Sequence, residues 1–180
     1  PYHISRLTRI SNEMVVQAPS FGKIAPKFLK FIGEDPLIIH NASFDIPFLE
    51  YHLQKSIQKS IVQPENQKKL LLRNTQHDTL TLARIFLPFQ AGFSLVKLAE
   101  YFHIEIKQHH RALPDASVAA EIFLKLIEIA LHCDFKDIRK IVEILEPSDN
   151  SSKNFFLQLV TVLAGAKYHF ERILDKESFI

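Results

Sequence analysis

The chain has 180 residues, of which 47% are hydrophobic and 23% are charged. A chain of this length and apolar content can bury a sizeable core, which excludes a disordered chain and suits one ordinary globular domain. The net charge of +2 permits a polyanionic partner without requiring one. The single Cys133 excludes an internal disulfide and any multi-cysteine metal site, so we expect a reducing, cytoplasmic location.

The longest apolar run, Phe155 to Ala164, is broken by Gln158 and Thr161 and is far shorter than the ~20 residues that cross a bilayer. We therefore expect no membrane association. The chain opens on Pro1, and no basic segment followed by an apolar one comes after it, so we expect a fragment of a longer protein.

The first third of the chain predicts helices around one short strand. A helical turn is expected over Ile4 to Ile10, and Ser11 can cap a second turn. Apolar residues recur at helical spacing from Ser20 to Gly33. The apolar run Leu37 to Ile39 is typical of a buried parallel strand with a neighbour on each edge, and helical periodicity resumes from Ser43 to Ile57.

The middle of the chain continues this alternation after a polar loop over residues 58–69. A second short strand is expected within Leu70 to His77, and Asp78 can cap a helix from Thr79 to Phe86. Ser94 can cap the next helix. A strongly amphipathic helix is then predicted from Ala116 to His132. Strands alternating with helices indicate an α/β domain, but two short strands cannot cover so many apolar helix faces, so strands are missing.

The remainder of the chain reads as helical. Asp134 can cap a helix that reaches Leu145, and Glu146 to Lys153 is the best candidate for a linker. A last helix is predicted from Phe155 to Leu174. We therefore divide the chain into a domain over residues 1–133 and a helical extension over residues 134–180.

Two stretches combine histidine with a carboxylate at a helix start. Pro114 suits the first turn of a helix, which fixes Asp115 there, while His110 lies in the loop just before it. Asp45 likewise enters a helix directly after the strand that ends at Ile39. A carboxylate suits a hard cation and an imidazole suits proton transfer, although helix capping and dipole effects explain the same residues without chemistry.

Several motifs in order resemble one family. These are His40-Asn41-Ala42-Ser43-Phe44-Asp45, then Asp78-Thr79-Leu80, then Ser94-Leu95, then His110-Arg111-Ala112-Leu113-Pro114-Asp115. Together they resemble the DnaQ-like proofreading exonucleases, the epsilon-subunit family of DNA polymerase III, which is a DEDDh branch of the ribonuclease H-like fold. The resemblance implies such a fold here, truncated at its N-terminal strands and followed by a C-terminal helical extension.

The resemblance also implies roles for individual residues. Asp45 and Asp115 would bind two divalent ions, Mg²⁺ or Mn²⁺, and His110 would be the general base. The substrate would be the single-stranded 3′ end of DNA, cut to nucleoside monophosphates, and the polymerase III catalytic subunit would be a partner. The residues implied to contact the terminal nucleotide or its phosphates are His40, Asn41, Phe44 and Arg111.

The family's first motif, an Asp-x-Glu pair on a strand, would stand before Pro1, and the only acid preceding Glu34 is Glu13. Three explanations remain open: a fragment of a complete protein, a truncated gene, or strands supplied by another chain. We favour the fragment and expect these 180 residues alone to have little nuclease activity. The alternative function is a catalytically silent module that binds a polymerase or nucleic acid through its helical extension.

Overall fold

The computed structural model describes residues 5–6, 8, 10–58, 72–106, 111–145 and 152–177, with side chains described as far as Gly165 in the last range. The two strands of this part of the chain are β1 (Leu37–Ile39) and β2 (Gln76–Asp78). Its helices are α2 (Asn12–Val16), α3 (Phe21–Ile32), α4 (Ala42–Gln58), α6 (Thr79–Phe86), α7 (Leu95–Tyr101), α8 (Ala112–Leu131), α9 (Phe135–Leu145) and α10 (Ser152–Glu177).

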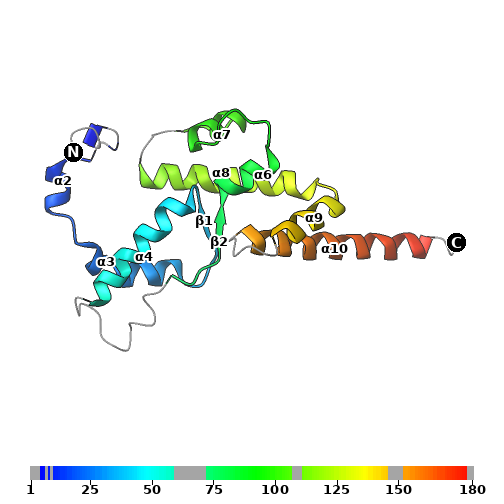
Figure 1. Ribbon diagram of the computed structural model, residues 1–180, viewed down its shortest axis with the longest axis horizontal. Helices are drawn as coiled ribbons and strands as arrows, with labels where there is room; N and C mark the ends of the chain where they lie inside the picture. Colours follow the sequence, from blue (N-terminus) through cyan, green and yellow to red (C-terminus); the bar gives the residue numbers. More distant parts are fainter. Residues whose placement is uncertain are drawn as a thin grey trace.

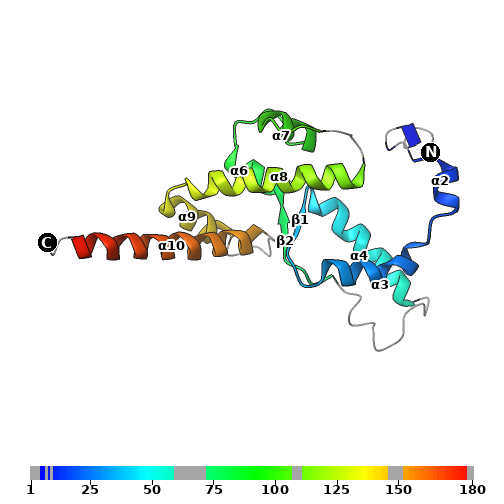
Figure 2. The same ribbon diagram turned by 180° about the vertical axis from the view of Figure 1, so that it is seen from behind.

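The two strands form a parallel pair at the centre of the molecule, with Ile39 opposite Asp78 (Figure 1). Helices α3 and α4 pack together on one side of the pair, while α6 to α10 gather on the other (Figures 1 and 2). The predicted α/β class is therefore confirmed, in a form dominated by helices.

The main hydrophobic core lies between α6, α7, α8 and the start of α10. Its fully buried members include Leu82, Leu98, Ile122, Leu126 and Phe156. Ile138 of α9 is also fully buried in this cluster, so helices on both sides of residue 134 share one core. The division of the chain at that residue stays a prediction.

Local capping predictions are confirmed by side-chain hydrogen bonds. The hydroxyl of Ser11 accepts from the backbone N–H of Met14, and the hydroxyl of Ser94 accepts from that of Lys97. Asp134 Oδ1 accepts from the backbone N–H of Lys136 at 2.8 Å. At the end of α3, Gly33 has a φ of 54°, a left-handed conformation that glycine adopts without a side-chain clash.

Several predicted boundaries were wrong. Helix α8 begins at Ala112, four residues before the predicted start, so Pro114 is the third residue of the helix. The N–H that proline lacks is not missed there, because the N–H groups of a first helical turn have no partner within the helix. Helix α10 begins at Ser152, within the predicted linker, whose residues 146–151 lie outside the described part. The second strand covers only Gln76–Asp78. The predicted loop over residues 58–69 begins one residue too early, because Gln58 is the last residue of α4; residues 59–69 lie outside the described part.

Strand β1 differs from the buried strand that its sequence predicts. Ile38 is 39% exposed, and in the described ranges β1 pairs with β2 alone. An apolar run of this kind is typical of a strand buried on both faces and paired on both edges, and in the described residues β1 is neither.

Helix α10 is the longest element, with 26 residues that correspond to ~39 Å. Its second half extends beyond the other helices, and the end of α10 lies far from the sheet (Figures 1 and 2). Among the described residues, no helix is long and apolar enough to cross a membrane.

Candidate active site

The candidate site forms where both parallel strands end. Because Ile39 pairs with Asp78, the turn that leads from β1 into α4 lies beside the end of β2. In open α/β sheets this carboxyl edge is where ligands bind. The structure therefore brings the His40 to Asp45 segment next to Asp78 and Thr79.

The carboxylate of Asp78 joins the two strand ends. Its Oδ1 accepts hydrogen bonds from the backbone N–H of Asn41 at 2.9 Å and of Leu80 at 3.0 Å. Its Oδ2 accepts from the Thr81 hydroxyl at 3.0 Å. With Asp78 only 7% exposed, these three bonds satisfy a buried charge and hold the turn before α4 against the start of α6.

The turn itself needs that support. Asn41 has a φ of 70°, which is unfavourable for most residues with a side chain and is tolerated best by asparagine and aspartate. Its amide oxygen accepts from the Ser43 hydroxyl at 3.0 Å, and its backbone carbonyl accepts from Phe44 N–H at 2.9 Å. The sharp turn directs the chain from strand into helix within two residues.

His40 is held by the opposite helix rather than left free. Its Nδ1 lies 2.9 Å from the Thr79 hydroxyl, which also lies 3.3 Å from the carbonyl of Ile39. Burial lowers the pKa of His40, although the charge of Asp78, a backbone hydrogen bond to Phe93 and the charge of Asp45 act in the opposite direction. A neutral imidazole at neutral pH follows.

Asp45 lies in the first turn of α4, as predicted, and the residue is exposed. Its pKa is raised, first by partial loss of hydration and second by the negative charge of Asp78, while His40 acts to lower it. A cation bound at Asp45 would offset this repulsion. Beside it, Phe44 is 74% exposed and open to a ligand.

The third predicted motif is described only in part. Asp115 lies in the first turn of α8 and is half-buried, and its backbone N–H donates to the carbonyl of Arg111. Arg111 is the N-cap residue of α8, but its side chain forms no capping bond. The predicted general base His110 lies outside the described residues.

A divalent ion would find ligands of the right kind but too few of them. Asp45 and Asp115 supply hard carboxylate oxygens at two helix starts, yet the charged groups that act on Asp45 are Asp78 and His40, not Asp115. In the described part of the chain, no group of three or more His, Cys, Asp or Glu side chains could hold a metal ion. The metal-binding roles of Asp45 and Asp115 stay predictions.

Sequence reasoning missed the second role of Asp78, which it assigned only to helix capping. The cap is confirmed, but the bond to Asn41 links residues 37 positions apart. A usable signal was present: Asp78 directly follows the predicted second strand, as His40 directly follows the run Leu37 to Ile39, and parallel strands bring their carboxyl ends to one edge.

Comparison with known proteins identifies the relatives of this chain. The Exonuclease (RNase_T) family model matches residues 1–123. The chain is 34% identical over 160 residues to the PolC-type DNA polymerase III of Caldanaerobacter subterraneus, covering 89% of this chain and 11% of that protein. It is 35% identical over 128 residues to the DNA polymerase III subunit epsilon of Aquifex aeolicus, covering 71% of this chain and 58% of that protein.

A third relative matches nearly the whole chain. The DNA polymerase III subunit epsilon of Rickettsia conorii is 33% identical over 174 residues, which is 96% of this chain and 72% of that protein. The chain thus spans about a tenth of the PolC-type relative and over half of the Aquifex subunit. It belongs to the exonuclease family, among relatives of the DNA polymerase III epsilon subunit and the PolC-type polymerase.

Proposed function

We propose that this chain carries the second and third motifs of a 3′–5′ exonuclease domain with a ribonuclease H-like fold. The domain hydrolyses the 3′-terminal phosphodiester of DNA during polymerase proofreading. The observation that carries the proposal is the position of Asp45, in the first turn of a helix at the carboxyl edge of the sheet and beside the buried Asp78. The names of the relatives support DNA as substrate and a polymerase as partner.

Asp45 and Asp115 would hold Mg²⁺ or Mn²⁺, and these ions would supply positive charge that stabilises the reacting phosphodiester. His110 takes the proton of the attacking water. Phe44 supplies an exposed ring against the terminal nucleotide, while Asn41 and His40 shape the wall of its pocket. Arg111, at the start of α8, contacts phosphate.

Each Mg²⁺ needs about six oxygen ligands, and Asp45 and Asp115 contribute only part of the acidic set expected for this family. We therefore expect the 180 residues alone to have little or no nuclease activity. Digestion of DNA from its 3′ end by the purified chain, dependent on Mg²⁺, would contradict this expectation.

The test of function uses the natural full-length protein and a labelled single-stranded oligonucleotide. His110→Ala and Asp115→Ala should each reduce Mg²⁺-dependent release of 3′-terminal nucleotides by about 10²-fold or more without lowering the melting temperature. Glu50→Gln removes an exposed carboxylate from α4 outside the site and serves as the control. Activity retained in either site variant would overturn the assigned role.

A catalytically silent module is the second candidate. It is favoured by the absence of a three-ligand metal group in the described residues and by the protruding second half of α10. The same assay on the full-length protein separates the two functions. An exonuclease releases 3′-terminal nucleotides, whereas a silent module releases none.

A further inference from the structure

Helix α4 carries a stripe of exposed aromatic side chains that the proposed site uses only at its first member. Phe44, Phe48 and Tyr51 are 74%, 64% and 55% exposed, and the exposed Lys55 follows them. At 100° per residue these four positions fall within ~60° of one another around the helix axis. We call this set the α4 stripe.

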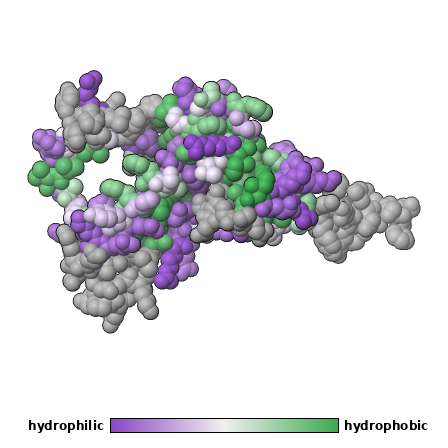
Figure 3. Space-filling model, in the orientation of Figure 1, coloured by the Kyte–Doolittle hydropathy of each residue, from purple (hydrophilic) through white to green (hydrophobic). Residues whose placement is uncertain are grey.

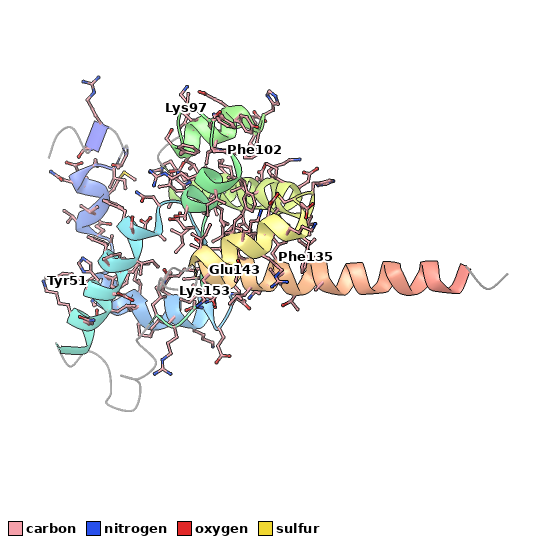
Figure 4. All side chains as sticks on the ribbon, turned by 45° about the vertical axis from the view of Figure 1, so that its right-hand side comes forward. Tyr51, Lys97, Phe102, Phe135, Glu143 and Lys153 are labelled. Atoms are coloured by element: carbon pink, nitrogen blue, oxygen red, sulfur yellow. The ribbon has the colours of Figure 1, made fainter. Side chains whose placement is uncertain are left out.

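The α4 stripe faces away from the part of the helix that packs in the fold. Ala42, Ile46 and Leu53 are the buried apolar residues of α4, and they lie on the other side of the helix axis. Tyr51 is seen on α4 on the side of the molecule away from α9 and α10 (Figure 4). Further hydrophobic surface lies on α2, at the same end of the molecule but separated from α4 (Figure 3).

The rings of the α4 stripe are braced from one side. His52 lies 4.5 Å from the Phe48 ring and 5.2 Å from the Tyr51 ring between centroids. It also contacts Phe21 of α3 at 5.7 Å, which ties the stripe to the neighbouring helix. Rings held in this way lose little conformational freedom when a ligand stacks on them.

The charge on the α4 stripe is positive. Lys55 Nζ lies 5.3 Å from the centre of the Tyr51 ring and donates to its hydroxyl at 3.3 Å. None of the ion pairs among the described residues involves Lys55. Glu50, the exposed acid of the same segment, projects from a different side of the helix. Among the four residues of the α4 stripe, therefore, none is acidic.

We infer that the α4 stripe binds single-stranded DNA leading away from the 3′ end held at Asp45, an inference that rests on the proposed function. Bases stack on the rings of Phe48 and Tyr51, and a phosphate pairs with Lys55. From Phe44 to Lys55 the helix rises ~16 Å, so a strand lying along it would extend over several nucleotides. Aromatic rings followed by a cation fit this polymer better than they fit an apolar protein surface.

The test measures binding of fluorescent oligo-dT of two and six nucleotides to the 180-residue chain without divalent ions. The double variant Phe48→Leu with Tyr51→Leu keeps the surface apolar but removes the flat rings. It should bind the longer oligonucleotide at least tenfold more weakly and the shorter one within twofold of the original chain. Phe89→Leu, which alters a fully exposed ring outside α4, should change neither affinity.

Lys55→Gln should weaken binding of the longer oligonucleotide about threefold and reduce the slope of log affinity against log salt by about one. Lys30→Gln, on α3, is the matched control. Unchanged binding of six nucleotides by the double variant overturns the inference, as does an original chain that binds six no better than two. Self-association that the double variant abolishes, without DNA binding, would instead assign the stripe to a second copy.

These outcomes are independent of cleavage. The proposed function would be refuted by nuclease activity that survives substitution of Asp115 in the full-length protein, whatever the α4 stripe binds. Failure of the stripe would leave those activity results unchanged.

Discussion

The two helix starts that carry the candidate metal ligands are held in different ways. The start of α4 is fixed by side chains from another part of the chain, since Asp78 binds Asn41 and Thr79 binds His40. The start of α8 is fixed by its own backbone, through the bond from Asp115 N–H to Arg111. The fold thus positions Asp45 by long-range contacts, whereas Asp115 follows from local helix formation.

The largest expected effect comes from breaking the support of α4. Asp78→Ala leaves the N–H groups of Asn41 and Leu80 and the hydroxyl of Thr81 without their acceptor. We expect a loss of about 2–4 kcal/mol in the free energy of unfolding, measured by urea denaturation. Asp134→Ala is the matched control, because that cap accepts one exposed bond and should cost about 1 kcal/mol. Equal losses in the two variants would contradict the special role of Asp78.

A smaller effect is expected from the turn residue. Asn41→Ala places a side chain without a local hydrogen bond at a φ of 70° and should cost about 1–2 kcal/mol, whereas Asn41→Gly should cost less. At the other helix start, Arg111→Ala removes no capping bond and should change stability by at most about 0.5 kcal/mol. Thermal unfolding of the three variants measures how much stability depends on each helix start. A larger loss of stability for Arg111→Ala than for Asn41→Ala would contradict the stronger dependence expected at the start of α4.

The smallest expected effect concerns the charge of Asp45. Because the folded state raises the pKa of this carboxyl, ionisation at neutral pH disfavours folding. Asp45→Asn should therefore be more stable than the original chain at pH 7, by at most about 0.5 kcal/mol for an exposed site.

The difference should vanish as the pH falls through the raised pKa and then below ~3.9, the ordinary value for an aspartate, where the carboxyl is neutral in both states. Melting temperatures from pH 7 to pH 3 measure it, and Glu50→Gln reports the general effect of removing a negative charge from α4. A stability gain that grows toward low pH would have the wrong sign. Asp78→Asn should lower the pKa of Asp45, because it removes one of the two causes that raise it.

Sequence reasoning succeeded where one local interaction decides the structure. Ser11, Ser94 and Asp134 each cap a helix through a backbone N–H two or three residues away, so the signal is contained in a few letters. Asp45 and Asp115 were placed in first helical turns for the same reason.

It failed where distant segments decide the structure. The bond from Asn41 to Asp78 depends on strand register, and the early start of α8 at Ala112 is not marked by a capping side chain. Helix α10 likewise starts at Ser152, within a segment whose composition is typical of a linker. Packing explains this start, because Ser152 is only 1% exposed and the neighbouring Phe155 and Phe156 lie in the core. Tertiary packing overrides local composition at these points.

The central claim is that Asp45 and Asp115 serve one divalent-metal site. Paramagnetic broadening by Mn²⁺ in NMR spectra of the natural full-length protein tests this claim most directly. We predict that signals of both residues broaden over the same Mn²⁺ range, and that Asp45→Asn reduces the broadening at Asp115 as well. Separate responses of the two residues, or broadening centred elsewhere, would contradict a shared site.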